Sequence, residues 1–256
     1  MKVLLLCNKT LENCDSNLSL IKKELENLSI EYTENIKDNA DLIITVGGDG
    51  TILHEAETAL EKNLAILGIN TGHLGFMASL ETENLKLLKR LKTGEYEIEE
   101  HLLLDIYING ELRKTVLNEF SVIREGYNGI ADIILTVDNE SSFSYRADGL
   151  IVATPTGSSA YSFSAGGPII EKSASVFMIT PVCPHSLMNR SLVVTPEHEI
   201  KITAESRSRL LAVGDGVEIS AIEKETEVIV KRSEKRLKMI SFPENSYFNV
   251  IKKKLL

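Results

Sequence analysis

The chain lacks the features that would take it into a membrane or onto a polyanion. No apolar run approaches the ~18–20 residues of a membrane span. The apolar stretch at residues 3–7 is shorter than a signal-peptide core and no small-residue cleavage site follows it, so we expect no secretion signal. Lys and Arg number 28 against 37 Asp and Glu, and the net charge of −9 disfavours nucleic acid and anionic membranes, which need a basic face.

Cysteine is also scarce. The three cysteines, Cys7, Cys14 and Cys183, are odd in number and show no CxxC spacing. We therefore expect neither a disulfide framework nor a structural zinc site, and we expect a cytoplasmic protein in a reducing compartment. The remaining composition is that of a globular chain, with 256 residues, 43% hydrophobic and 25% charged. This length predicts one large domain or two small ones, and a local site for a small anionic ligand is compatible with the acidic balance.

Apolar runs and amphipathic stretches alternate along the first ninety residues. Short apolar runs followed by breakers predict buried parallel strands at residues 3–7, 40–46 and 64–69. Apolar residues at helical spacing predict helices at residues 16–28, 51–60 and 83–91. This alternation predicts an α/β N-terminal domain with a parallel, Rossmann-like sheet.

The pattern changes after residue 95 to short β-rich stretches. They are separated by turn dipeptides such as Asn109-Gly110, Asn128-Gly129 and Asp138-Asn139. The stretches are residues 102–108, 114–123, 130–137, 150–153, 176–180, 192–194, 199–203, 210–213 and 227–231. They predict an all-β, sandwich-like C-terminal domain. We place the α/β domain at residues 1–94, joined by the tail 242–256, and the β-rich domain at residues 95–241.

The sharpest local motif is GGDGT at residues 47–51, between an apolar strand and an amphipathic helix. Glycines let a ligand approach the backbone closely, and N–H groups at a helix N-terminus attract anions. A carboxylate among such glycines suits a proton acceptor or a metal ligand beside phosphate. The alternative is a plain strand-to-helix turn with Asp49 as the N-cap. The motif is neither a Walker A loop nor GxGxxG.

Two further polar segments follow apolar strands. Residues 68–76 read GINTGHLGF, at the strand end where open α/β sheets bind ligands, and Phe76 could pack on a base or a ribose or lie in the core. Asn118-Glu119 offers an amide and a carboxylate that can hold ribose hydroxyls. The alternative for this pair is an ordinary polar strand end.

The longest motif runs from Arg146 to Pro168. An apolar strand leads into TPTGSSAYSFSAGGP, which supplies small hydroxyl donors and the flat face of Tyr161. Such a loop suits a nucleoside held by many short hydrogen bonds, whereas the alternative is a Ser/Gly-rich surface linker. Arg146 and Asp148 bracket the motif with both charge signs. The later loops PVCPHSL at residues 181–187 and VGDGV at residues 213–217 are weaker, and the second reads as a hairpin turn.

Taken together, these segments resemble the NAD kinase family (ATP- or polyphosphate-dependent). The matching pieces occur in the family's order: GGDGT at residues 47–51, GHLGF at residues 72–76, Asn118-Glu119, DGLIVATPTGSSAYSFSAGGPI at residues 148–169, TPVCPHSL at residues 180–187, and GDG at residues 214–216. The resemblance implies ATP-dependent phosphorylation of the 2′-hydroxyl of the adenosine ribose of NAD, and an NAD-binding β-rich domain. It also implies a site between the two domains.

The resemblance also implies roles for individual residues. Asp49 would be the proton acceptor, with Gly50 beside it. Phe76 would line the pocket, Asn118 and Glu119 would bind a ribose, and Arg146 and Asp148 would flank the nicotinamide or adenine end. The residues that would hold adenine and ribose are Thr156, Ser159, Ala160, Tyr161, Ser162 and Ser164.

The resemblance brings further expectations. NAD and ATP would be the substrates, with a divalent metal, Mg²⁺, bridging phosphates, although no protein residue is assigned as its ligand. The assembly would be a homodimer or homotetramer. The sequence departs from the family at Val217, where the family often has Gln, and at Ser159, where it usually has Thr.

Two other interpretations stay open. Another kinase of the GGDGT group would act on a lipid or a sugar, although a lipid kinase should show an apolar or basic membrane face. A non-catalytic dinucleotide sensor would bind NAD or NADP without turnover.

Overall fold

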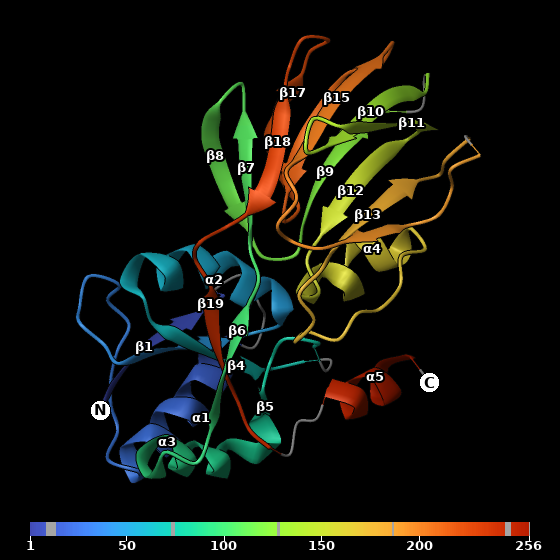
Figure 1. Cartoon of the computed structure of the whole chain (residues 1–256). Helices are drawn as coiled ribbons and strands as arrows, with labels where there is room; N and C mark the ends of the chain where they lie inside the picture. The colour runs from blue at the N-terminus through green and yellow to red at the C-terminus, as the bar shows by residue number, and fades with distance from the viewer. Residues whose placement is uncertain (9–13, 73–74, 127–128, 186, 244–246, 256) are drawn as a thin grey trace. The chain divides into compact units, whose positions relative to one another are not determined.

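A computed structural model describes the chain except for residues 9–13, 73–74, 127–128, 186, 244–246 and 256. The described residues form two compact units, Met1–Glu100 with Leu237–Leu256, and His101–Arg236 (Figure 1). Among these residues, no helix has both the length and the apolar character needed to cross a membrane. Asn128, part of a predicted turn, lies outside the described residues.

The first unit is built on a seven-stranded sheet in the order β2-β1-β3-β4-β19-β6, with β5 paired to β4. Its strands are β1 (Lys2–Cys7), β2 (Glu31–Thr33), β3 (Leu42–Val46), β4 (Ala65–Asn70), β5 (Leu80–Glu81), β6 (Glu97–His101) and β19 (Leu237–Ser241). Its helices are α1 (Cys14–Asn27), α2 (Asp49–Lys62), the 3-10 helix η1 (Thr82–Lys89), α3 (Arg90–Thr93) and α5 (Tyr247–Leu255). The pairs β1–β2, β1–β3, β3–β4 and β4–β19 are parallel, so the predicted α/β fold class is confirmed.

The core of this unit explains the unbroken apolar runs of its strands. All five residues of β3 are buried, as expected for a parallel strand covered on both faces. Leu18, Ile21 and Leu25 of α1 belong to one buried cluster with Val3 and Ile44 of the sheet. These helical residues recur at three- and four-residue spacing, and this spacing places them on one face of α1.

Several elements of the first unit differ from the sequence prediction, and the short strands β2, β5 and β6 were not predicted. The predicted helix at residues 83–91 was wrong in type, because η1 is a 3-10 helix with non-helical dihedrals at Asn84. Only the short α3 follows it, ending at Gly94 with φ +73°. The strand β19 was not predicted, because its partner β4 lies far away in the sequence and no local pattern indicates the pairing.

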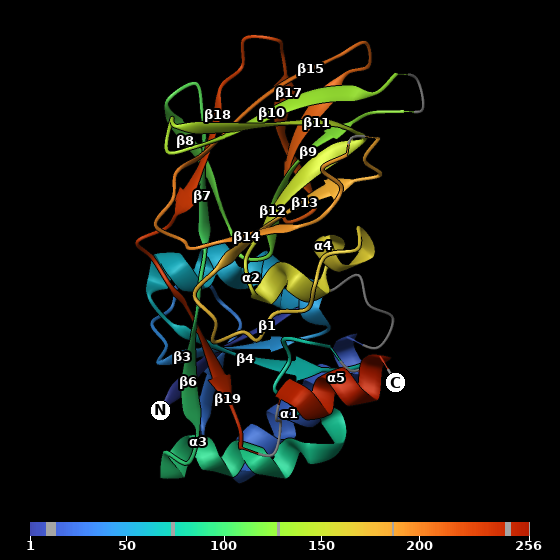
Figure 2. The same ribbon diagram turned by 45° about the vertical axis from the view of Figure 1, so that its right-hand side comes forward.

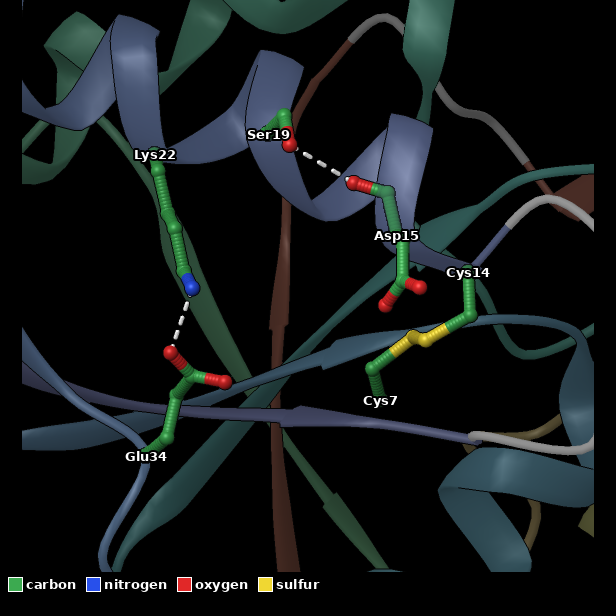
Figure 3. Close-up of a disulfide and its surroundings, with 6 residues drawn as sticks. All are labelled: Cys7, Cys14, Asp15, Ser19, Lys22 and Glu34. Carbon is green, nitrogen blue, oxygen red and sulfur yellow. Dashed lines mark hydrogen bonds and ion pairs between the residues drawn. A yellow bond between two sulfur atoms is a disulfide. The ribbon is translucent and has the colours of Figure 1, made fainter.

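A disulfide joins Cys7, the last residue of β1, to Cys14, the first residue of α1 (Figure 3). Their Cα atoms are 6.5 Å apart. We expected no disulfide framework, and the structure corrects that expectation for this one pair. The close approach depends on where the strand ends and the helix begins, which the spacing of two cysteines does not reveal. Cys183 is free and exposed.

The second unit contains two six-stranded antiparallel sheets, in the orders β11-β10-β15-β18-β7-β8 and β14-β13-β12-β9-β16-β17. The first sheet has β7 (Leu104–Ile108), β8 (Glu111–Val116), β10 (Ala131–Val137), β11 (Ser141–Ala147), β15 (Ile200–Ser206) and β18 (Val228–Arg232). The second has β9 (Glu119–Arg124), β12 (Gly149–Ala153), β13 (Phe177–Val182), β14 (Leu192–Val194), β16 (Leu210–Gly214) and β17 (Val217–Ile222). The 3-10 helix η2 (Thr156–Ser159) and α4 (Tyr161–Ser164) follow β12 (Figure 2).

One apolar core lies between the two sheets. Strands β7 and β10 alternate buried with less buried residues, as strands with one core face do. Tyr145, Phe120 and Phe177 are the largest of its fully buried side chains. The predicted sandwich-like β domain is therefore confirmed.

The predicted single strand at residues 114–123 was wrong. The chain breaks after Val116, so that β8 belongs to one sheet and β9 to the other. The backbone changes sheets at Leu117 and Asn118. Stretches rich in β-forming residues lie on both sides of the polar pair Asn118-Glu119, and this concealed the break in the sequence.

Candidate functional site

The GGDGT segment turns the end of β3 into the start of α2. Gly48 is the N-cap and Asp49 is the first helical residue, so the N-cap alternative for Asp49 is wrong. The Asp49 carboxylate accepts hydrogen bonds from the backbone N–H groups of Phe76 (2.7 Å), Met77 (3.0 Å) and Ala78 (3.3 Å). These three donors fix the carboxylate at the carboxyl ends of the central parallel strands, where open α/β sheets bind ligands.

The second glycine motif is shaped around this carboxylate. A Cβ atom at Gly75 would lie 1.9 Å from Asp49 Oδ1, so only glycine fits at that position. Gly50 is exposed, and a Cβ there would meet nothing within 4 Å. His73 and Leu74 of the motif lie outside the described residues.

The C-terminal helix α5 brings a cation to the same motif. Lys254 Nζ lies 4.4 Å from the centroid of the Phe76 ring, a cation–π distance. The sequence prediction joined this tail to the first domain but assigned no site residue to it. Lys254 is thus a basic residue next to the Asp49 loop that the motifs did not reveal.

In the second unit, Asn118 and Glu119 present two acceptor atoms that the protein itself does not satisfy. Asn118 Oδ1 and Glu119 Oε2 are buried, and no described residue donates a hydrogen bond to either atom. Glu119 is 8% exposed. Buried polar atoms are normally hydrogen-bonded, so two adjacent acceptors without donors indicate a ligand that donates.

The environment of Glu119 favours its neutral form. Burial, and after it the negative charge of Asp215, raise the pKa of Glu119 to about 7, although the Tyr161 N–H donates a hydrogen bond that opposes the shift. Perturbed carboxyl groups of this kind concentrate at functional sites. Asp215, which the sequence indicated only as part of a hairpin turn, is a further residue of this site that the motif analysis passed over.

The hydroxyl-rich loop after β12 folds back on the end of β8. The Thr154 N–H donates to Asn118 O (2.9 Å), and the Thr154 hydroxyl donates to Leu117 O (2.6 Å). A Cβ at Gly157 would lie 2.0 Å from Asn118 O, so the loop can approach this closely only with glycine there. Thr154 and Gly157 hold the loop against the acceptor pair.

Several of the predicted hydroxyl groups contact other atoms of the protein. Thr156 Oγ1 is 2.9 Å from Nδ1 of the buried His101, and Ser162 Oγ is 3.1 Å from Thr180 Oγ1. Ser159 Oγ donates to Thr156 O at 3.4 Å. Ser164 is exposed and Ala160 is half-buried.

Tyr161 lies close to the acceptor pair and to Asp148. Burial raises the pKa of the Tyr161 phenol, and the charges of Cys183, Asp148 and Glu119 raise it further. Tyr161 is 37% exposed, which leaves part of the residue available for stacking. Asp148 forms an ion pair with Arg124 at 2.7 Å.

Arg146 faces a different hollow. It pairs with Asp132 at 3.4 Å across β10 and β11. It also lines a cavity of about 510 Å³ whose other lining residues are Gly129, Ile130, Asp132, Glu205, Ser206 and Arg207. The structure therefore brings Glu119, Tyr161 and Asp148 together in one part of this unit and places Arg146 on a separate cavity.

Comparisons with known proteins show to which family the chain is similar. The family described as ATP-NAD kinase N-terminal domain matches residues 7–96, and the one described as ATP-NAD kinase C-terminal domain matches residues 117–242. A protein named NAD kinase from Caldicellulosiruptor saccharolyticus is 36% identical over 95% of this chain and 94% of its own length. One with the same name from Methanothermobacter thermautotrophicus is 38% identical over 87% of this chain and 80% of its own length.

Two solved structures share the fold. The NAD kinase from Archaeoglobus fulgidus in complex with ATP has a TM-score of 0.80 and 28% identity, covering 99% of this chain and 98% of that one. The yeast NADH kinase complexed with NADH has a TM-score of 0.87, covering 100% of this chain and 87% of that one. At 22% identity, the second supports the fold alone.

Proposed function

This chain belongs to the NAD kinase family, and we propose that it transfers the γ-phosphoryl group of ATP to the 2′-hydroxyl of the adenosine ribose of NAD, giving NADP and ADP. One observation from its own residues carries the assignment. Asn118 Oδ1 and Glu119 Oε2 are adjacent buried acceptors without donors. A ribose offers two neighbouring hydroxyls, each able to donate one hydrogen bond to one of these oxygens.

The remaining nucleotide contacts are proposed from position. The partly exposed Tyr161 ring would stack on a base, with Ser159, Ala160 and Ser164 beside it. Thr156 and Ser162 would act by shaping the loop, since their hydroxyls contact His101 and Thr180. Asp148 would contact the nicotinamide or adenine end.

Asp49 is proposed as the proton acceptor for the attacking hydroxyl. Phosphoryl transfer needs mainly positioning and charge neutralisation, and the base has only to accept one proton as the oxygen attacks. Three backbone N–H groups already orient the Asp49 oxygens. Gly50 and Phe76 would line the same part of the site.

The divalent metal is proposed to bind to the protein together with the substrate ATP. Over the described part of the chain, no three His, Cys, Asp or Glu side chains cluster as a metal site would require. Mg²⁺ commonly binds through substrate phosphates and keeps several waters. We therefore propose that it arrives as the Mg²⁺ complex of ATP.

We further propose a homodimer or homotetramer acting in the cytoplasm. Exposed apolar residues on sheet strands, among them Leu112, Val193 and Val217, support self-association. The low cysteine content supports a reducing compartment.

A single assay tests the proposed activity. Purified protein is incubated with NAD, ATP and Mg²⁺, and NADP is measured with an NADP-specific dehydrogenase. We expect NADP to form in proportion to enzyme. NAD binding without NADP formation would support the sensor instead, and neither binding nor turnover would favour a lipid or sugar kinase.

A further inference from the structure

Asp215 is half-buried in the turn between β16 and β17. Its Oδ2 accepts a hydrogen bond from the N–H of Leu117 (2.7 Å), and its Oδ1 accepts from the N–H groups of Asn118 (2.8 Å) and Glu119 (3.2 Å). The Asp215 N–H in turn donates to Glu119 O at 3.0 Å. Four hydrogen bonds thus connect one turn residue to three consecutive residues of a distant segment.

These hydrogen bonds satisfy backbone N–H groups at the break between β8 and β9. Where the chain leaves one sheet for the other, the N–H groups of residues 117–119 need acceptors outside the usual strand ladders. Three successive backbone N–H groups form a small anion-binding concavity, and the Asp215 carboxylate occupies it.

The conformation and contacts of the turn place this carboxylate. Asp215 and Gly216 have φ values of +50° and +75°, as a tight hairpin turn requires. Gly214 pairs with Phe120 of β9, which brings the turn to the start of that strand. Lys114 Nζ donates to Gly214 O at 2.8 Å and holds the turn from β8.

We infer that Asp215 is a positioning residue, which holds Asn118 and Glu119 with their acceptor oxygens aimed at the ribose. The inference rests on the ribose site proposed above. Asp215 acts on the backbone of the pair from one side, while Thr154 and Gly157 of the loop after β12 hold Asn118 from the other. Neither support needs to touch the nucleotide.

Asp215 also acts on Glu119 through its charge. After burial, that charge is the second cause of the raised pKa of Glu119. The Tyr161 N–H lowers this pKa from α4, and the Lys114 ammonium lies near Asp215. Removing the Asp215 charge should therefore let Glu119 ionise at lower pH, which a residue with a purely structural role would not cause.

The test compares Asp215→Asn with Asp138→Asn. Asp138 is a matched control, because it also accepts a backbone N–H in a turn, from Glu199, but it is exposed. We expect Asp215→Asn to raise KM for NAD about ten-fold or more with a smaller change in kcat, and to move the midpoint of the pH profile of NAD affinity to lower pH. Asp138→Asn should leave both values as in the wild type.

Asp215→Glu keeps the charge and displaces the oxygens by one methylene, so it should raise KM for NAD without moving that midpoint. This variant carries the test if circular dichroism shows that Asp215→Asn does not fold. An unchanged KM for NAD in whichever Asp215 variant folds would overturn the inference. NAD binding by calorimetry gives the same reading if the wild type makes no NADP, so failure of the proposed activity is distinguished from failure of the positioning role.

Discussion

Replacing Glu119 by glutamine should change how the stability of the protein depends on pH. The pKa of Glu119 is about 7 in the folded chain against an ordinary value of 4.5. The folded protein therefore binds more protons than the unfolded chain between these pH values, and its free energy of unfolding falls as pH rises through that window. The shift corresponds to roughly 3 kcal/mol in full. Glutamine does not titrate, so the free energy of unfolding of Glu119→Gln should not fall with pH in this way.

The measurement is urea unfolding followed by circular dichroism at pH 5, 6, 7 and 8. The free energy of unfolding of Glu119→Gln minus that of the wild type should rise by about 2–3 kcal/mol across this range. Thr136→Ala is the control. It removes a hydroxyl that lies 3.0 Å from Ser142 Oγ and no titratable group, so the change in free energy of unfolding should be a constant offset over this range. A difference for Glu119→Gln that does not vary with pH would refute the reasoning.

Three further substitutions test the Asp49 loop and the acceptor pair. Asp49→Asn should lower kcat about 100-fold or more, in line with the loss of a general base, while calorimetry shows retained NAD binding; unchanged turnover would remove Asp49 from the mechanism. Gly75→Ala should lower kcat and destabilise the protein by about 1–3 kcal/mol, because its Cβ would lie 1.9 Å from Asp49 Oδ1. Gly157→Ala should instead raise KM for NAD, because its Cβ would displace Asn118, and an unchanged KM would contradict the close approach of the loop.

The sequence was sufficient for the parts of the fold that follow from local patterns. Continuous apolar runs predicted the buried parallel strands β1, β3 and β4, because these strands are covered on both faces. Turn dipeptides with positive φ, such as Asn109-Gly110, indicated the antiparallel region. The GGDGT motif also indicated a turn from strand to helix, and α2 begins within it.

What the sequence could not supply depends on contacts between distant residues. Asp215 reads as an ordinary turn residue, because its partners lie at residues 117–119 and nothing local connects the two segments. The break between β8 and β9 was missed for the same reason, since residues typical of strands lie on both sides of the polar pair Asn118-Glu119. The Lys254 contact with Phe76 depends on where α5 returns, which three lysines in a row do not reveal.

The pairing of β19 with β4 also fixes an order of events during protein synthesis. Met239 pairs with Ile66, so the sheet of the first unit is incomplete until residues 237–241 have left the ribosome. Residues 101–236, which form the second unit, emerge before that strand does. The β sandwich can therefore fold before β19 completes the sheet of the first unit. Newly made chains should become resistant to protease in the sandwich first.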